Sequence, residues 1–334
     1  MLASAESETV RSDAARAAAA MTQPMLPLGQ YLLTFTAIES VRLPEFSGST
    51  WRGVLGHALR ELSCITGFSQ CEGCPQQLAC AYGYLFLSPP PPNTERMRLY
   101  TNAPHPYLLR PSGKSGSLVR AGEQVEVELI LVGHGNRFLG LFVQALALAT
   151  QRGVGRGDGR LILSSVCQAD PGVPPAWHEI LDDGQLRPLR PTRPALVALR
   201  ENVTVIIEQP LRLARHNKIV RSEELTFSDL FTNLLRRISM LQYFHTGTPL
   251  DTDFAGLVAA SRKVEIINRD LHWHRWNRYS SRQNKRIAMD GIVGSFTIQG
   301  DDLAPFWPYL WLGQWVHAGK GTTMGLGHFQ LAAD

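Results

Sequence analysis

The first half of the chain alternates between strand-like and helix-like patterns of apolar residues. Residues Gln124–Val132 set Val and Leu against Glu at alternate positions, which indicates a strand with one face in the core. Residues 136–150 are so apolar that we expect their helix to lie against a sheet. The predicted elements are, in chain order, a strand at 31–38, a helix at 51–62, a strand at 124–132, a helix at 136–150 and a strand from Leu161.

The second half repeats this plan. The predicted elements are a strand at 202–208, a helix opened by the capping box Thr226-Phe-Ser-Asp229, a strand at 292–299, an apolar run at 310–316 that fits either a helix or a strand, and a strand at 328–332. Glycine-rich segments at 153–159 and 319–327 precede the last strand of each half. This order predicts an α+β protein of two tandem ferredoxin-like (βαββαβ, RRM-like) domains, each with a glycine-rich loop.

Prolines mark the boundary between the halves. Six prolines fall at 171–194, where they stiffen the backbone and disfavour both helix and central strand. The first residues are rich in Ala and lack the apolar core of a signal peptide, which predicts a disordered tail. We therefore divide the chain into a tail (1–25), an N-terminal domain with a proline-rich insertion at 87–120 (26–170), a linker (171–196) and a C-terminal domain (197–334).

The composition is that of a globular protein. Hydrophobic residues make up 44% of the chain and charged residues 19%, which excludes a disordered or coiled-coil protein. No apolar run approaches the roughly 20 residues that a membrane helix needs, so we expect a cytoplasmic protein without a membrane partner. The net charge is 33 − 29 = +4, but residues 261–290 alone carry eight Lys or Arg and three acids, a net +5 that favours a polyanionic partner.

The glycine spacing near the C-terminus is the most distinctive pattern. Residues 316–329 read VHAGKGTTMGLGHF. Glycine permits positive φ and lets backbone N–H groups approach a phosphate closely. Taken alone, such spacing more often marks a tight loop between packed elements, and because it opens no helix it is neither a Walker A sequence nor a dinucleotide fingerprint.

Residues 316–329 also resemble the C-terminal glycine-rich loop of the CRISPR-associated endoribonucleases of the RAMP superfamily, which process pre-crRNA. Segment 153–159 is similar to a loop in their first domain, and Arg278-Tyr-Ser-Ser-Arg-Gln283 followed by Gly291-Ile-Val-Gly294 is similar to this group too. The resemblance implies a pair of ferredoxin-like folds that bind CRISPR repeat RNA and cut it once. It also implies that the ribose 2′-OH attacks the adjacent phosphorus without a metal, leaving a 2′,3′-cyclic phosphate.

This reaction needs a base, an acid and a cation. The resemblance implies a catalytic histidine on the first helix, where this chain has His57, and helical periodicity places His57 on the polar face of that helix. The competing interpretation is a solvated surface histidine. His317 and Lys320 at the glycine segment, and His245 at the end of the later helix, are the other catalytic candidates.

Aromatic residues interleave with the basic ones at 261–290, a mixture that suits RNA with unpaired bases. Trp273 and Trp276 would then stack on bases, although a charged hairpin with packed tryptophans explains the pattern as well. The residues predicted to bind RNA are basic, aromatic or part of the glycine segment: Arg52, Arg60, Arg156, Arg275, Arg278, Tyr279, Arg282, Lys285, Arg286, Gly319, Gly321, Gly325 and Gly327.

Four cysteines, Cys64, Cys71, Cys74 and Cys80, fall within seventeen residues. Four thiolates are what a tetrahedral Zn²⁺ needs, and the pair Cys71-Glu-Gly-Cys74 has the spacing of a zinc knuckle. An iron–sulfur cluster and free thiols are the alternatives. Because protein would fill all four positions, the predicted Zn²⁺ is structural, and no cofactor is expected for catalysis.

Three functions remain open on the sequence. The first is the metal-independent endoribonuclease, and the second is a non-catalytic RNA-binding subunit of a CRISPR effector complex. The third is a metal-cluster protein unrelated to RNA. In the first two, the partners are CRISPR repeat RNA or crRNA and other effector subunits.

Overall fold

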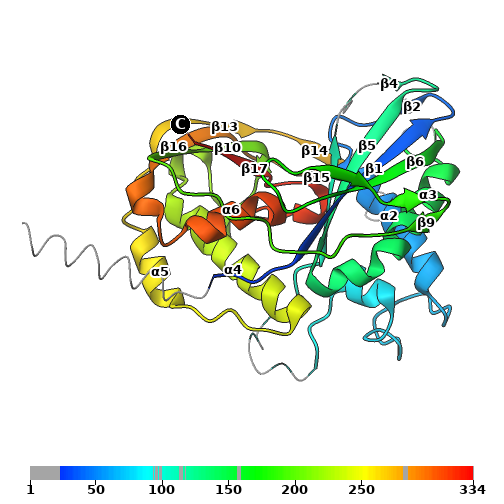
Figure 1. Cartoon of the computed structure of the whole chain (residues 1–334), viewed down its shortest axis with the longest axis horizontal. Helices are drawn as coiled ribbons and strands as arrows, with labels where there is room; N and C mark the ends of the chain where they lie inside the picture. Colours follow the sequence, from blue (N-terminus) through cyan, green and yellow to red (C-terminus); the bar gives the residue numbers. More distant parts are fainter. Residues whose placement is uncertain are drawn as a thin grey trace, which may run out of the picture.

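Two antiparallel sheets of the same topology form the molecule (Figure 1). The computed structural model describes residues 23–92, 94, 97, 100–112, 116, 118–155, 159–280 and 285–333. Residues 1–22, most of the predicted tail, lie outside this range. The first sheet has the strand order β3-β5-β1-β6-β7 and the second has β13-β16-β10-β17.

The elements of the N-terminal half are β1 (Leu28–Ala37), β2 (Val41–Arg42), α2 (Gly48–Ser63), η1 (Gly83–Leu87), β3 (Tyr107–Ser112), β4 (Leu118–Val119), β5 (Gln124–Val132), η2 (Gly133–Phe138), α3 (Leu139–Arg152), β6 (Leu161–Ala169), β7 (Trp177–Glu179), β8 (Leu181–Asp182) and β9 (Gln185–Leu186). If β7 is left out, β3, β5, β1 and β6 are the second, third, first and fourth strands of the domain, and they lie side by side in that order. This is the ferredoxin-like order, with α2 and α3 packed together as the two helices.

The elements of the C-terminal half are β10 (Asn202–Leu211), β11 (Ala214–Arg215), β12 (Lys218–Ile219), η3 (Ser222–Glu224), α4 (Phe227–Thr246), α5 (Phe254–Ser261), β13 (Ile267–His274), β14 (Asn277–Ser280), β15 (Lys285–Ala288), β16 (Gly291–Gln299), η4 (Gly300–Leu303), α6 (Trp307–Val316), η5 (Thr322–Met324) and β17 (Phe329–Ala333). The four-stranded sheet repeats the order second, third, first, fourth, and α4 and α6 pack against each other. The predicted pair of ferredoxin-like domains is confirmed.

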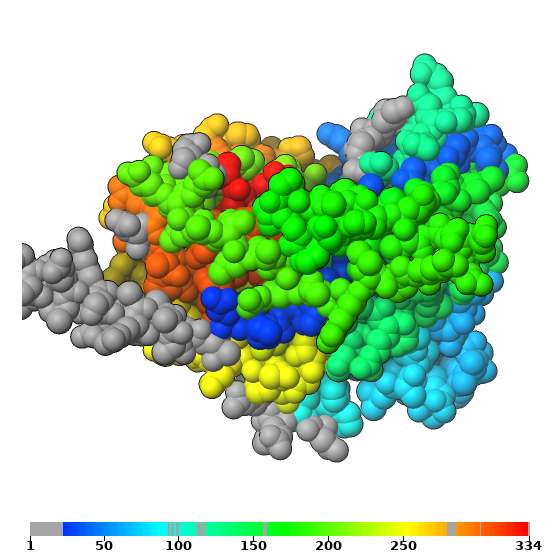
Figure 2. Space-filling view, in the orientation of Figure 1, coloured from blue at the N-terminus to red at the C-terminus, as the bar shows by residue number. Residues whose placement is uncertain are grey.

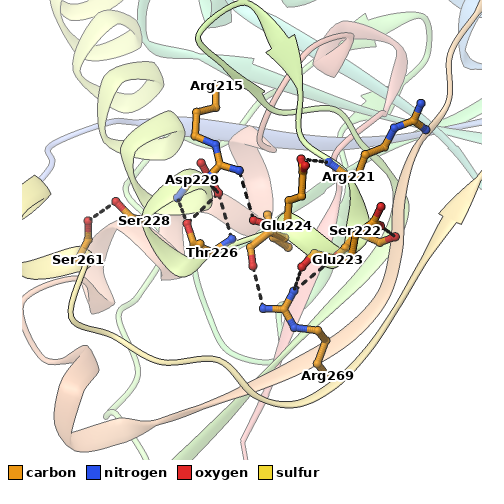
Figure 3. A network of polar contacts seen from close by, with 11 residues as sticks. Arg215, Arg221, Ser222, Glu223, Glu224, Thr226, Ser228, Asp229, Ser261 and Arg269 are labelled. Carbon is orange, nitrogen blue, oxygen red and sulfur yellow. Dashed lines mark hydrogen bonds and ion pairs between the residues drawn. The ribbon is translucent and has the colours of Figure 1, made fainter.

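The start of α4 shows how local sequence fixes an element. The hydroxyl of Thr226 accepts from the N–H of Asp229 at 3.2 Å, and the Asp229 carboxylate accepts from the N–H of Thr226 at 3.0 Å, so the predicted capping box forms (Figure 3). Arg269 of β13 donates to the carbonyls of Ser222 at 3.1 Å and Leu225 at 2.8 Å. Arg269 therefore holds η3 and the start of α4 in place, so its guanidinium is engaged inside the protein.

Two proline-rich stretches contribute more structure than expected. The predicted insertion at 87–120 contains β3, an edge strand of the first sheet, and an edge strand tolerates Pro111 because one side of it is unpaired. The predicted linker at 171–196 contributes β7 and the β8–β9 hairpin. Prolines at the ends of these short strands hid them in the sequence.

After β9 the chain crosses from one domain to the other over the molecular surface, in the green region of Figure 2. Thr192 accepts from the N–H of Leu28 at 3.0 Å, and the indole N–H groups of Trp311 and Trp307 donate to the carbonyls of Ala195 and Val197, both at 2.8 Å. These bonds tie the crossing segment to α6 as well as to β1.

The junction between the domains is packed. Leu28, Leu108, Ile130 and Val132 of the first domain are buried in the same apolar cluster as the core of the second domain. His245 at the end of α4 adds a polar link to this junction, described below. No helix in the described part of the chain is long and apolar enough to cross a membrane.

Candidate nucleic-acid interface

Four glycines give the segment between α6 and β17 its shape. Gly319, Gly321, Gly325 and Gly327 all have φ between +68° and +87°. A Cβ on Gly327 would lie 1.8 Å from the carbonyl oxygen of Ala318, and one on Gly319 would lie 2.6 Å from that of Arg212. These positions need glycine both for the positive φ and for the close backbone packing. We call residues 317–328 the glycine loop.

The glycine loop lies against the first domain. A Cβ on Gly48, the first residue of α2, would lie 1.9 Å from the carbonyl oxygen of Met324, and a Cβ on Gly325 would lie 3.0 Å from that of Leu109 in β3. Arg52 of α2 donates from Nε to the hydroxyl of Thr323 at 3.1 Å. The loop thus joins the start of α2 to the second domain.

Most backbone N–H groups of the glycine loop are already engaged. Gly319 donates to the side-chain oxygen of Asn233 at 2.7 Å, Lys320 to the carbonyl of Arg212 at 3.0 Å, and Gly327 to that of Pro210 at 3.1 Å. Gly325 donates within the loop, to Thr322. The N–H groups of Gly319, Gly325 and Gly327 are thus used within the protein, whereas no such bond is described for Gly321, and the phosphate contact of the glycines stays a prediction.

Cations gather at this junction, and among the described residues none of them forms a close ion pair with a carboxylate. Arg52 packs its guanidinium over the ring of Phe86, 4.3 Å from the centroid. Arg278 of β14 lies near Arg52: its pKa is lowered by partial burial and then by the charge of Arg52. Among the described residues, the Nε of Arg278 has no hydrogen-bond acceptor. Arg212, next to β10, also has a buried Nε without a hydrogen-bond acceptor among the described residues. Burial lowers its pKa, and the nearby carboxylate of Asp290 partly offsets this effect. Lys320 is exposed.

Five arginines elsewhere are paired with carboxylates. The described ion pairs use Arg110, Arg152, Arg160, Arg187 and Arg215. Within that part of the chain, none of the cations at the glycine loop has such a partner. Clustered cations with unsatisfied donors cost free energy unless an anion binds them, so this junction is suited to phosphate.

The basic strands β14 and β15 extend this surface. Arg275, Lys285 and Arg286 are exposed. The two tryptophans are turned inward instead: Trp276 makes an edge-on contact with Phe46 just before α2, and Trp273 lies under the guanidinium of Arg221 at 4.1 Å. These contacts favour the packed-tryptophan interpretation over base stacking. Of the other predicted contacts, Arg156 and Arg282 lie outside the described residues, and Tyr279 is placed only by its backbone in β14.

Arg60, the last predicted RNA contact on α2, is engaged locally. Its Nη2 donates to the carbonyls of Phe68 and Ser69, at 2.6 and 2.8 Å. The guanidinium therefore ties the last turn of α2 to the segment that follows. We do not include Arg60 among the cations at the glycine loop.

His57 lies on the solvent side of α2, as helical periodicity predicts. It is exposed and shares a stripe of spacing four with Gly53 and Glu61, which are also exposed. It lies five positions after Arg52, the nearest α2 contact with the glycine loop, which is about 7.5 Å along the helix axis. The imidazole is accessible to RNA, and Arg52 is the cation on the same helix.

His317, by contrast, is inaccessible. It has no exposed surface, and burial drives its pKa well below the ordinary value, so the ring is neutral. Its Nδ1 bonds to the carbonyl of Leu326 at 3.2 Å, and the ring packs on His328, with centroids 4.9 Å apart. A neutral, enclosed imidazole cannot reach an RNA hydroxyl, and we set His317 aside as the base.

His245 is also enclosed. Burial lowers its pKa to about 4. Its Nδ1 accepts from the hydroxyl of Tyr84 at 2.9 Å and its Nε2 donates to the carbonyl of Pro104 at 2.6 Å, both in the other domain. With both ring nitrogens occupied, His245 links the two domains and has no nitrogen left for proton transfer.

An ionic network next to the glycine loop, in which Glu128 and His328 are buried, had no sequence signal. Arg110 of β3 contacts both Glu128 of β5 and the Nε2 of His328, and the Nδ1 of His328 donates to Glu208 of β10 at 2.7 Å. Burial lowers the pKa of His328, partly offset by Glu208. The network crosses from one domain to the other and fixes the loop's last residue.

The four clustered cysteines are all half-buried and line one pocket beyond the end of α2. Among the residues that the structure describes, no three His, Cys, Asp or Glu side chains are arranged as a metal site. The predicted zinc site therefore stays a prediction, and it is taken up below.

Comparisons with known proteins agree with this architecture. Residues 26–193 match the family model AF_1859_N, an N-terminal domain, and residues 205–329 match that of the CRISPR-associated endoribonuclease Cas6. No curated protein sequence matches the chain.

Solved structures show the same fold at low sequence identity. A Thermus thermophilus Cas6 in a product complex superposes with a TM-score of 0.52 at 15% identity, over 92% of this chain and 99% of that one. A partial Cas6-RT-Cas1–Cas2 complex gives a TM-score of 0.56 at 14% identity, over 94% of this chain and 47% of that one. At such identities these likenesses concern the fold alone.

Proposed function

The chain is a Cas6-like CRISPR RNA-processing protein, with the AF_1859_N N-terminal domain followed by a Cas6 domain, and from this premise we propose that it cuts CRISPR repeat RNA into mature guide RNAs. The cut is made at one site that is specified by repeat sequence or structure. Repeat RNA is both its substrate and, as crRNA, its product.

The cation cluster at the glycine loop is the observation that carries this proposal. Among the described residues, Arg52, Arg212 and Arg278 form no close ion pair, although Asp290 lies near Arg212, and Lys320 of the same loop region is exposed. A polyanion supplies the missing negative charge, and an extended one can reach from this cluster to the exposed strands β14 and β15.

The chemistry we propose needs no metal ion. His57 accepts the proton of the ribose 2′-OH as that oxygen attacks the adjacent phosphorus, and the 5′-oxygen leaves with a proton from an acid. The products are a 2′,3′-cyclic phosphate and a 5′-hydroxyl. The exposure of His57 on α2 supports this role, and the burial of His317 and His245 removes two of its competitors. Lys320 is the exposed cation that we assign to the phosphate charge.

Other CRISPR proteins are proposed as partners. Two of the structures with the same fold are Cas6-RT-Cas1–Cas2 complexes, one of them partial. A complex of this kind, or an effector complex that keeps the crRNA, would receive the product from this chain.

Incubation of the protein with its repeat RNA in excess EDTA is expected to yield a single cut. The 5′ fragment should carry a cyclic phosphate, because the internal 2′-OH is the nucleophile and no metal-bound water takes part. Mass spectrometry of the fragments reads the end groups directly. A 3′-hydroxyl product, or cleavage abolished by EDTA and restored by Mg²⁺, would contradict the mechanism.

Arg278→Gln is expected to weaken repeat-RNA binding about tenfold and to lower the slope of log K against log[salt] by about one, because one phosphate contact is lost. The measurement is a fluorescence-anisotropy titration at several salt concentrations. Arg187→Gln is the matched control, since it removes the same charge from an exposed arginine paired with Asp182 after β9. Equal effects of the two substitutions would show that only net charge matters.

The second candidate function is a non-catalytic RNA-binding subunit. Its support is that His57 makes none of the described contacts with the glycine loop, while His317 and His245 are enclosed. Repeat RNA bound tightly but left intact would favour this function.

A further inference from the structure

The segment between α2 and η1 has no core of its own. From residue 61 to residue 82 not one side chain is buried, and the large apolar residues Ile65, Phe68 and Leu78 are 86, 52 and 59% exposed. Apart from a few turns the backbone here is irregular. Segments that bury so little apolar surface are held in other proteins by disulfides or metal ions.

The four cysteines are gathered at one place in this segment, and Ile65 and Phe68 lie at the same place. All four line one pocket, bounded by Arg60 of α2 and Tyr82 before η1. The Sγ atoms of Cys64 and Cys74 both approach the hydroxyl of Thr66, at 3.9 and 3.5 Å. In a segment without a buried side chain, four half-buried thiols around one pocket are the feature that could organise the backbone.

The backbone around the middle pair forms a compact turn. The N–H of Cys74 donates to the carbonyl of Cys71 at 3.2 Å, and Gly73 between them has φ +77°. Cys64 follows the last residue of α2, and Cys80 lies three residues before η1. The pocket therefore collects one thiol from each end of the segment and two from the turn in its middle.

We propose that Cys64, Cys71, Cys74 and Cys80 bind one Zn²⁺ as thiolates. Each thiol releases its proton on binding, and the four sulfurs move together to complete the tetrahedron. The segment makes few contacts that would resist this movement. With every position taken by protein the ion is structural, and the inference does not depend on what the chain does to RNA.

Such an ion would brace the helix that carries His57. The segment connects the end of α2 to η1, and Phe86 of η1 packs against α2: a Cβ on Gly56 would lie 2.4 Å from the Phe86 ring, and Arg52 covers the same ring. Arg60 adds its two hydrogen bonds to the carbonyls of Phe68 and Ser69. The zinc would hold α2 and η1 at a fixed distance.

Elemental analysis of the full chain, purified without a histidine tag, tests the proposal. We expect one Zn²⁺ per chain in the wild type and in Cys167→Ser, whose cysteine lies in β6, and less than about a tenth of that in the Cys71→Ser/Cys74→Ser variant. Iron with acid-labile sulfide, no metal after incubation with Zn²⁺, or zinc retained by the double variant would each overturn the assignment.

A thiol titration of the wild type keeps the proposal testable if the double variant does not fold. Before metal removal, one thiol of the five cysteines should react quickly with a disulfide reagent in native protein, and all five after a zinc chelator is added and the protein denatured. Five reactive thiols before chelation would overturn the proposal, whatever the result of the RNA-cleavage assays.

Discussion

Replacing His57 by alanine is expected to slow the cleavage of repeat RNA by about 10²–10⁴-fold, the usual contribution of a general base. Binding of the RNA should change little, because the imidazole is exposed and makes none of the described contacts with the glycine loop. Single-turnover cleavage measured with enzyme in excess separates the chemical step from binding. The fold should be unaffected for the same reason.

His178→Ala is the matched control for this experiment. His178 in β7 is also a largely exposed histidine, with its Nε2 3.6 Å from the Asp170 carboxylate. Its removal is expected to leave both rate and affinity unchanged. If His57→Ala cut as fast as His178→Ala, the base would have to be sought elsewhere. If neither variant nor the wild type cut, the chain would be a binding subunit.

Gly327→Ala is expected to lower the free energy of unfolding by roughly 3 kcal/mol and to weaken RNA binding with it. The alanine would adopt φ +68°, which costs about 1 kcal/mol, and its Cβ would lie 1.8 Å from the carbonyl oxygen of Ala318, so the backbone must shift. Urea unfolding followed by circular dichroism measures the change.

Gly184→Ala separates the two parts of this effect. Gly184 has φ +75°, but a Cβ there would meet no atom within 4 Å. Its replacement should therefore cost only the backbone strain, about 1 kcal/mol. A Gly327 variant no less stable than the Gly184 variant would mean that the loop yields without cost. The loop would then not be the rigid support that the proposed function requires.

The elements that sequence analysis predicted are those whose signals are local. The alternation at Gln124–Val132 and the capping box at Thr226 and Asp229 lie within a few residues, and both formed as predicted. Strands β13–β15 were missed because their arginines, histidines and tryptophans read as a charged run. Their strand character comes from pairing with β16 and with each other, which no local pattern encodes.

Among the site residues too, sequence analysis could place only those whose position depends on a local pattern. The position of His57 follows from helical periodicity, and the structure places it on the exposed face. The sequence could not predict that His245 is buried, because it is enclosed by contacts with Tyr84 and Pro104 of the other domain. Arg212 was missed altogether. It is an isolated arginine in the sequence, and only folding brings it to the loop.

The tight junction between the domains has a consequence for how RNA is recognised. His245, the Arg110–Glu128–His328 network and the crossing segment bound by Trp307 and Trp311 all join the halves before any ligand arrives. The entropy of orienting the two domains is therefore lost during folding and not during binding. The protein presents a preformed template, and the repeat must adjust its own shape to fit, so RNAs already folded into that shape bind with the smallest penalty.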